Sequence, residues 1–367
     1  MKNLSFVTPS PLQGRRGARV LRLADQEEWK TLISQSDSHD FYHTWSYHHL
    51  QQEHGEPLLF VYQQNTVYVA IPFIKRVIMG SGYYDLTSAY GYCGPIASIP
   101  FGALHVQFVM QFKSAFLEFL EEEKIVSVFA GLNPFIDQLP FLEVIGGVQD
   151  NGVTVAIDLQ LSLEEQRSRY GKKVRGQIRR VKDLGWTASY ACTAADVDAF
   201  LEIYNENMNR VDAADNYRFT SEYITALLAS TDFDAHLMLV RNEQQYPVCG
   251  AIAISNGHVL QAHILGTREE YRHLSPAKYS TEEYTILARN LGLKYFNLGG
   301  GLGFRKDSLF EWKIRLSPLT FNYKTWRYVA DPVRYDQLID HYGIDRNAHL
   351  DYFPLYRAAA ALHQNIS

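Results

Sequence analysis

Residues 297–317 read NLGGGLGFRKDSLFEWKIRLS, which contains three adjacent glycines, a fourth glycine two residues later, a charged turn and an amphipathic segment. Lys294–Leu298 predicts a short strand before the glycines, and Asp307 is a favourable N-cap for a helix that carries Lys313. Adjacent glycines suit a backbone that needs positive φ or a close approach to another group. The order strand, glycine loop, helix predicts a substrate loop at Gly299, Gly300 and Gly301, with a connector in a crowded corner of the fold as the alternative.

Motifs of several other enzyme classes are missing from the sequence. No Gly-Lys-Ser/Thr follows the glycines and no Gly-x-Gly-x-x-Gly is completed, which disfavours a nucleoside triphosphatase and a dinucleotide enzyme. The histidines lack His-Glu-x-x-His spacing, so we predict no metal site, and no Gly-x-Ser-x-Gly elbow indicates a serine hydrolase. The three cysteines lie far apart, and we expect them to be ordinary reduced thiols.

Length and composition set the broad class of the protein. At 367 residues the chain exceeds what one hydrophobic core usually supports, so we expect two domains. A net charge of −5 argues against a generally positive surface, and we expect no DNA partner. No apolar window approaches the ~20 residues of a membrane span, and the N-terminus does not resemble a signal peptide. We therefore expect a cytoplasmic protein without a membrane span.

The order of the expected elements suggests an internal repeat. In the first half a strand hairpin precedes a helix at Leu104–Glu122 and a strand at Ile125–Ala130. A second hairpin precedes a helix at Ser275–Leu291 and a strand at Tyr295–Leu298. This pattern predicts a mixed α/β (α+β) protein with two similar domains in tandem.

We expect four segments along the chain. Residues 1–17 form a loose leader, 18–150 the first domain, 151–318 the second domain, and 319–367 a C-terminal strand and helix. The last segment is expected to hold a strand at Leu319–Tyr328 and a helix at Val333–Tyr342 that return to the first domain.

Residues 167–184, RSRYGKKVRGQIRRVKDL, predict one long basic helix. At 100° per residue, Lys172, Arg175, Arg179 and Lys182 share a face that is separate from an apolar stripe. Such a face can hold a diphosphate, a nucleotide-linked sugar, the phosphates of coenzyme A or an RNA backbone, although charge runs are often only solvated surface. We predict a phosphate-binding set with the members Lys172, Arg175, Arg179 and Lys278.

Several groups of residues, taken together and in order, resemble the tandem acyltransferases related to the Fem peptidoglycan-bridge enzymes, which have the GNAT (acyl-CoA N-acyltransferase) fold. The resemblance extends roughly over residues 40–345. The matching pieces are residues 84–88 (YDLTS), 91–95 (GYCGP), 182–185 (KDLG), 204–210 (YNENMNR), 263–267 (HILGT), 274–278 (LSPAK), the glycine loop, and residues 307–313 (DSLFEWK).

This resemblance implies two GNAT-like domains, each a mixed central sheet flanked by helices, with the first on the acceptor side and the second on the donor and catalytic side. It implies transfer of an acyl or aminoacyl group onto an amine, from acyl-CoA or from aminoacyl-tRNA. The chain departs from the staphylococcal branch because it lacks a long coiled-coil arm between its halves. It also departs from simple GNAT enzymes, because Arg272–Ala277 lacks their glycine-rich pyrophosphate motif, which disfavours coenzyme A binding in the ordinary GNAT manner. A helix opened by Ser275 and Pro276 would still present amides to an anion.

Acyl transfer to an amine needs stabilisation of a developing oxyanion and an uncharged nitrogen nucleophile. Lys313 is the first catalytic candidate, because the resemblance places a lysine just beyond the glycine loop, and a lysine on an amphipathic helix is the alternative. Asp307 is either a general base or a helix cap. His263 is either a base or hydrogen-bond donor, or a structural strand histidine.

Two further groups are candidates for substrate binding. Tyr204, Asn207 and Arg210 have helical spacing that suits a sugar or a carboxylate. In the first half a polar aromatic loop suits the hydroxyls of an acceptor, or is simply a tyrosine-rich turn. The residues of that loop are Asp85, Ser88, Tyr90 and Tyr92.

From these observations we expect a cytoplasmic N-acyltransferase without a permanently bound cofactor. Its acceptor is expected to be an amine of a cell-surface precursor, such as a nucleotide-linked amino sugar in polysaccharide biosynthesis of the cell envelope. The first alternative is an aminoacyl-tRNA-dependent ligase that extends a peptidoglycan stem peptide, with tRNA as a partner. The second is a GNAT-like protein that has lost catalysis and only binds a glycan or nucleotide.

Overall fold

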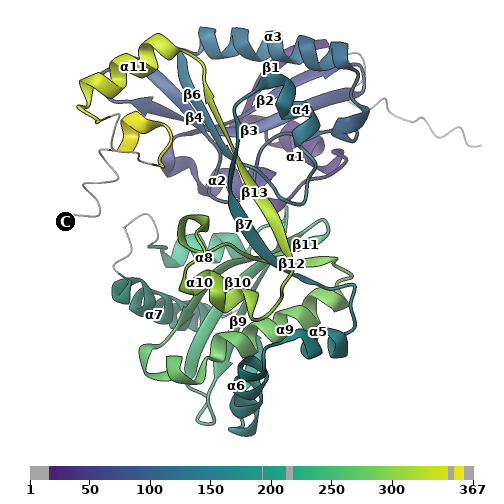
Figure 1. Ribbon diagram of the computed structural model, residues 1–367, viewed down its shortest axis with the longest axis vertical. Helices are drawn as coiled ribbons and strands as arrows, with labels where there is room; N and C mark the ends of the chain where they lie inside the picture. Colours follow the sequence, from purple (N-terminus) through teal and green to yellow (C-terminus); the bar gives the residue numbers. More distant parts are fainter. Residues whose placement is uncertain (1–15, 192, 212–217, 346–350, 359–367) are drawn as a thin grey trace, which may run out of the picture.

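The computed structural model describes residues 16–191, 193–211, 218–345 and 351–358. These residues form one mixed sheet of thirteen strands in the order β1-β2-β3-β4-β6-β13-β7-β12-β11-β10-β9-β8, with β5 paired to β3 beside this path. The sheet runs through both halves of the molecule, and helices cover it in each half (Figure 1).

The first half contains the elements that precede residue 148. Its elements are β1 (Arg16–Arg22), α1 (Gln26–Ser34), α2 (Trp45–Leu50), β2 (Glu56–Gln64), β3 (Val67–Ile78), β4 (Tyr83–Thr87), β5 (Ile96–Ala97), α3 (Val106–Glu122), β6 (Ile125–Gly131) and α4 (Leu139–Ile145). The predicted helix at Leu104–Glu122 and strand at Ile125–Ala130 are present within two residues of these bounds.

The second half follows β7 (Val148–Asp158). Its elements are α5 (Leu163–Arg169), α6 (Lys172–Asp183), β8 (Thr187–Ala191), α7 (Ala194–Arg210), α8 (Ser221–Leu228), β9 (Asp234–Arg241), β10 (Pro247–Asn256), β11 (Val259–Thr267), α9 (Pro276–Asn290), β12 (Tyr295–Gly299) and α10 (Ser308–Ile314). Strand β13 (Thr320–Val329) and helix α11 (Pro332–His341) follow.

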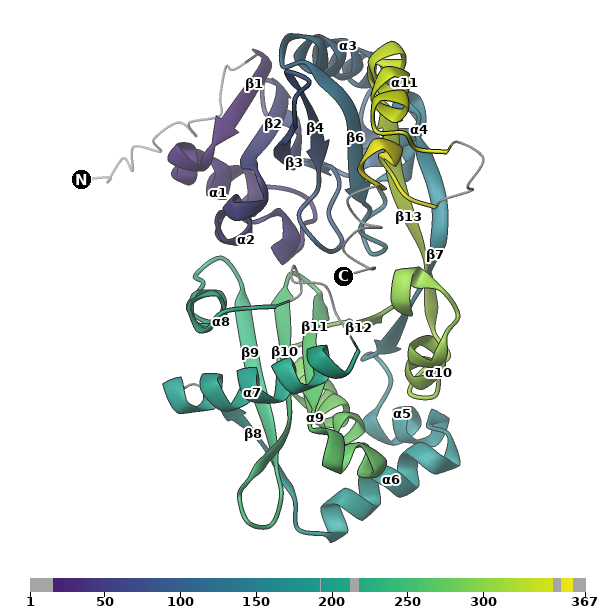
Figure 2. The same cartoon turned by 90° about the vertical axis from the view of Figure 1, so that its left-hand side faces the viewer.

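The two halves repeat one arrangement, as the order of the elements predicted. In the first half β2, β3 and β4 form an antiparallel meander, α3 follows, and β6 pairs parallel to β4. In the second half β9, β10 and β11 form the meander, α9 follows, and β12 pairs parallel to β11. In the second half α7 and α9 lie on opposite faces of the sheet (Figure 2). The mixed α/β tandem fold is therefore confirmed.

The predicted long basic helix is wrong in one respect, because the structure has two helices there. Helix α5 ends at Arg169 and α6 begins at Lys172, with Tyr170 in an extended conformation between them. The Tyr170 ring is buried, and the Gly171 amide donates to the Arg315 carbonyl oxygen at 3.3 Å. Tertiary contacts at this position therefore override the helical pattern of the sequence.

The ends of the chain also refine the predictions. Strand β1 begins at Arg16, inside the predicted leader, and residues 1–15 lie outside the described residues. The predicted C-terminal strand and helix are present as β13 and α11. Among the described residues, no helix has both the length and the apolar character needed to cross a membrane.

Strands β7 and β13 connect the two halves. Strand β13 pairs with β7 over residues 320–326 and with β6 over residues 325–329, and β7 pairs with β12 over residues 155–158. Trp326 of β13 is fully buried in the core of the first half, against Phe73 and Phe116. Its indole N–H donates to the Gly146 carbonyl oxygen at 2.8 Å. The core of the first half is thus completed by a strand from the end of the chain.

We expect Trp326→Ala to lower the free energy of unfolding by about 3–5 kcal/mol, because the change leaves a large cavity in a packed core. Urea denaturation measures this loss. Tyr328→Ala, two residues along the same strand at a half-buried position, serves as the matched control and should cost less. A loss for Trp326→Ala no larger than that of the control would show that β13 is not needed by this core.

Candidate functional site

The site is centred on the opening between strands β11 and β12. These strands pair only from Val259–Gln261 to Tyr295–Asn297 and then separate. On its other side β11 has a bulge at His263, because Ala262 and Ile264 are opposite the consecutive residues Ala253 and Ile252 of β10. Bulges are common next to active sites, where they terminate pairing and redirect side chains.

Strand β12 ends because of Asn297 and Gly299. The Asn297 Oδ1 atom accepts a hydrogen bond from the Gly299 amide at 3.0 Å. Gly299 has φ +76°, a conformation that favours glycine. This turn starts the loop that leads to α10, so the predicted order of strand, glycine loop and helix is confirmed.

Asp307 links the glycine loop to the start of α10 by hydrogen bonds. One carboxylate oxygen accepts from the Phe310 amide at 2.9 Å and the other from the Leu302 amide at 3.0 Å. The hydrogen bonds from Phe310 and Leu302 lower the pKa of the carboxyl group. Both oxygens are thus used to hold the helix and the loop, and the geometry matches the helix-cap alternative rather than the base.

Lys313 points back from α10 into the glycine loop. Its Nζ donates to the Gly300 carbonyl oxygen at 2.5 Å. Burial lowers the pKa of the ammonium group to about 8, and the charge of Asp307 offsets only part of this effect. The side chain is therefore a cation close to its point of deprotonation, held against the loop.

Tyr92 reaches the same place from the first half of the chain. A Cβ atom added to Gly299 would lie 3.1 Å from the Tyr92 hydroxyl and 3.4 Å from Lys313 Nζ. Burial raises the pKa of the Tyr92 phenol, while contacts with Asn297 and the Gly300 backbone lower it in part. A protonated phenol and an ammonium group thus converge beside Gly299.

The loop that carries Tyr92 is held by side-chain amides. Asn133 Nδ2 donates to the Tyr92 carbonyl oxygen at 3.2 Å, and Gln138 Nε2 donates to the Cys93 carbonyl oxygen at 2.9 Å. The Tyr92 ring also packs edge-on against Tyr42 and Tyr323. Because these groups come from separate parts of the chain, they fix the phenol in one orientation.

The other predicted residues of the first half do not join this group. Asp85 is buried within β4, where its carboxylate accepts from Arg76 at 2.7 Å and from Arg357 at 2.5 Å. The Ser88 hydroxyl accepts from the Gly131 amide at 3.2 Å, and the Tyr90 side chain is exposed. Of the predicted acceptor loop, the structure therefore brings only Tyr92 to Lys313.

The His263 ring lies between the halves rather than beside Lys313. It packs edge-on against Phe41 and Tyr47, with ring centroids 5.5 and 6.0 Å apart. Neither ring nitrogen has a hydrogen-bond partner among the described residues, and burial lowers the pKa to about 4. The imidazole is therefore neutral at pH 7 and has no proton-transfer partner within the described chain.

The three predicted residues of α7 do not form one binding face. Tyr204 is buried and stacks on Phe200, and its backbone lies close to Gly266 of β11. Asn207 accepts from Arg210 at 3.0 Å, and Arg210 is paired with Glu269 at 3.2 Å. Binding of a sugar or carboxylate at Asn207 and Arg210 would have to compete with these contacts.

The predicted phosphate-binding residues lie on α6 and α9. Lys278 is buried near the start of α9 and its Nζ donates to Gln177 Oε1 at 2.5 Å. Burial lowers the Lys278 pKa, and the positive charges of Lys173 and Arg315 lower it further. The α6 side chains of Lys172, Arg175 and Arg179 are exposed.

Sequence reasoning missed a buried chain of polar side chains between the halves. Asn297 Nδ2 donates to Gln261 Oε1 at 2.8 Å, and Gln261 Nε2 donates to Asp40 Oδ2 at 2.7 Å. Asn133 Nδ2 reaches the same Asp40 oxygen at 3.3 Å. Asn297 could have been found from the sequence, because it is a polar residue in the predicted strand just before the glycine loop. Asp40 and Gln261 belong to no recognisable sequence motif.

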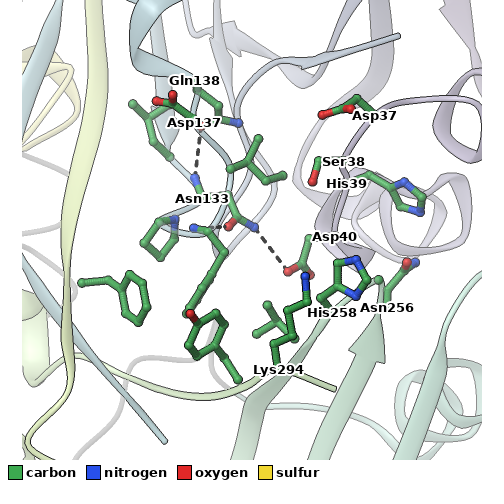
Figure 3. A pocket seen from close by; sticks show the side chains of 18 of the residues that line it. Asp37, Ser38, His39, Asp40, Asn133, Asp137, Gln138, Asn256, His258 and Lys294 are labelled. Carbon is green, nitrogen blue, oxygen red and sulfur yellow. Dashed lines mark hydrogen bonds between the residues drawn. The ribbon is translucent and has the colours of Figure 1, made fainter. Parts of the chain in front are cut away.

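Asp40 also lines a cavity of about 650 Å³ between the two halves. Figure 3 shows its carboxylate within the cavity wall, next to Asn133. Burial raises the pKa of Asp40 to about 7, although the hydrogen bonds from Gln261 and Asn133 lower it in part. Within the described residues, no group of three or more His, Cys, Asp or Glu side chains is placed to hold a metal ion.

Comparison with known proteins agrees with the fold described above. Residues 168–313 match the family model described as an acetyltransferase (GNAT) domain. The crystal structure of FemX is 12% identical, with a TM-score of 0.65 and coverage of 87% of this chain and 99% of that one. The structure of L-PGS from Bacillus licheniformis is 12% identical, with a TM-score of 0.58 and coverage of 84% and 94%.

A third structure is the C-terminal domain of a putative lysylphosphatidylglycerol synthetase from Agrobacterium fabrum, 12% identical with a TM-score of 0.53 and coverage of 86% and 97%. Comparison with curated protein sequences gives no match. At this identity the similarity concerns the fold. The predicted resemblance is confirmed at that level: residues 168–313 match the GNAT domain model, and the chain shares its fold with FemX.

Proposed function

We propose that this protein is an N-acyltransferase that moves an acyl group on to an amine of a cell-surface precursor, such as a nucleotide-linked amino sugar. The observation that supports this most is the convergence of Tyr92 and Lys313 beside Gly299, at the opening between β11 and β12. A cation and a protonated phenol at one point suit a reaction in which negative charge develops on a carbonyl oxygen.

In the proposed reaction the neutral amine of the acceptor attacks the carbonyl carbon of the donor. A carbon–nitrogen bond forms and the carbonyl oxygen becomes an oxyanion, which the Lys313 ammonium stabilises. The intermediate then expels the thiol of a thioester, or the hydroxyl of an aminoacyl ester, and this leaving group takes up a proton while the amine loses one. Because its phenol remains protonated, Tyr92 can donate a hydrogen bond at the same centre.

The cations near the start of α9 are the proposed site for the phosphates of the donor. The positive charges of Lys173 and Arg315 act on Lys278, and the amides at the beginning of α9 favour an anion. This arrangement fits coenzyme A phosphates even though the glycine-rich motif is missing. We therefore propose acyl-CoA as the donor.

The exposed row on α6 favours a second candidate, an aminoacyl-tRNA donor. Lys172 and Arg179 form no ion pair among the described residues, and a row of solvent-facing cations suits an RNA backbone. The fold does not distinguish an acyl-CoA donor from an aminoacyl-tRNA donor. Acylation that requires a thioester supports the first candidate, and activity abolished by ribonuclease supports the second.

The experiment that tests the proposal is mass spectrometry of a nucleotide-linked amino sugar incubated with the protein and acetyl-CoA. An acylated product confirms transfer to an amine. Thermal unfolding with each substrate gives an independent measure of binding, since a ligand at 100 times its Kd stabilises by ~2.7 kcal/mol. Binding without product from thioester or aminoacyl-tRNA donors would instead identify a protein that only binds glycan or nucleotide.

We expect Lys313→Met to lower kcat by about 10²- to 10³-fold, because it removes the charged donor to the oxyanion. Steady-state acylation kinetics measure the effect. Lys306→Met is the matched control, since Lys306 is an exposed lysine of the same loop, and it should leave kcat within about threefold of the parent. Activity of Lys313→Met within threefold of the parent would reject the role of Lys313.

We also expect kcat to fall as the pH rises through about 8. Burial lowers the Lys313 pKa from 10.5 to about 8, so the ammonium form needed by the oxyanion is present below that pH and lost above it. The residual activity of Lys313→Met should lack this alkaline decrease. If the decrease remained in Lys313→Met, another group would be responsible for it.

A further inference from the structure

The cavity beside Asp40 is separate from the transfer site. It lies between the halves at the start of β12, and its wall is built from residues 36–40 after α1, residues 132–139 after β6, and residues 256–259 between β10 and β11 (Figure 3). Lys313 and the glycine loop lie at the other end of β12. The side chains of Gln261 and Asn297 stand between Asp40 and Gly299.

Of the two carboxylate oxygens of Asp40, only Oδ2 accepts hydrogen bonds of normal geometry from the described residues, although the backbone amides of Phe41 and Tyr42 also interact with the carboxyl group and lower its pKa in part. The Asp40 side chain is buried, with 2% of the residue exposed. Oδ2 accepts from Gln261 and from Asn133, whereas Oδ1 accepts no hydrogen bond of normal geometry from any described residue. A buried carboxylate with an unused oxygen is costly, and a hydrogen-bond donor from a ligand would remove that cost.

The charges around the cavity favour a cation. Asp37 and Asp137 are exposed acidic residues in the lining, in addition to Asp40. Of the two lysines in the lining, Lys324 is already paired with Asp150. Burial lowers the pKa of His39, which therefore stays neutral at pH 7 and adds no positive charge. Among the described residues of the lining, three carboxylates thus accompany one lysine without an ion pair, Lys294.

We propose that this cavity is a second ligand site, which binds a small molecule through a primary ammonium group donated to Asp40 Oδ1. The ammonium supplies the missing donor and the opposite charge. This ligand is not the amine acylated at Lys313, because Gln261 and Asn297 lie between the two places. The inference therefore does not depend on the proposed reaction.

The site is also connected to the transfer loop. Because Gln261 directs its NH₂ group to Asp40, its carbonyl oxygen faces Asn297 Nδ2, and Asn297 Oδ1 is left to accept from the Gly299 amide. A ligand cation that keeps Asp40 as an acceptor fixes the orientation of both amides. Occupation of the cavity therefore stabilises the turn at Gly299.

The test is isothermal titration calorimetry of the full chain with two pairs of probes, ethanolamine against ethylene glycol and glucosamine against glucose. We expect at least one amine to bind at least tenfold more tightly than its hydroxyl analogue. Asp40→Asn should weaken that amine by tenfold or more, because the carboxylate charge is lost. Glu143→Gln, at an exposed acidic residue outside the cavity lining, should change the affinity less than threefold.

Two further variants separate failure of this site from failure of the transfer reaction and from misfolding of Asp40→Asn. Lys313→Met should bind the amine as the parent does, so failure of the transfer mechanism and failure of this site are distinguishable. Ser38→Phe, at a half-buried lining position, should weaken the same amine by filling the cavity, and it decides the matter if Asp40→Asn does not fold. The proposal is overturned if neither amine binds the parent, if the hydroxyl analogues bind equally well, or if folded Asp40→Asn retains the affinity.

Discussion

The buried carboxylate of Asp40 holds the facing surfaces of the two halves together, in addition to strands β7 and β13 that join them. A buried carboxylate is tolerated only where hydrogen bonds replace its water, and here the donors come from Asn133 in the first half and Gln261 in the second. If the halves were displaced, Gln261 would separate from the Asp40 oxygen and leave polar atoms buried without partners. The polar chain therefore fixes β12 against the first half and, through Asn297, fixes Gly299.

The two halves have the same arrangement of elements and contribute different groups to the candidate site. In the second half, β11 and β12 separate after three paired residues, and the glycine loop and Lys313 lie at that opening. The first half contributes Tyr92 on a loop held by Asn133 and Gln138. Strands β7 and β13 continue through both halves, so the phenol and the ammonium are positioned by one sheet rather than by two domains that move independently.

The candidate site was partly predictable from its own segment. Glycine, an N-cap and a periodic helix are local signals, and the turn at Gly299, the cap at Asp307 and Lys313 on α10 were found where they were expected. Tyr92 was one of four residues proposed in its loop, yet its sequence neighbour Tyr90 is exposed and Asp85 is bound by two arginines. No local pattern distinguishes these neighbours, because the difference arises from what packs against each side chain.

By itself the sequence determined the alternation of strands and helices, the repeat of the two halves and the strand, glycine loop and helix order, since each of these follows from residues within one turn or one strand of each other. Tertiary structure decided the rest. It ended α5 at Arg169 because Tyr170 is buried, it brought Tyr92 to Lys313, and it joined Asp40, Gln261 and Asn297. Such contacts link residues far apart in the chain, and their energy comes from burial and hydrogen bonding that exist only once the sheet has formed.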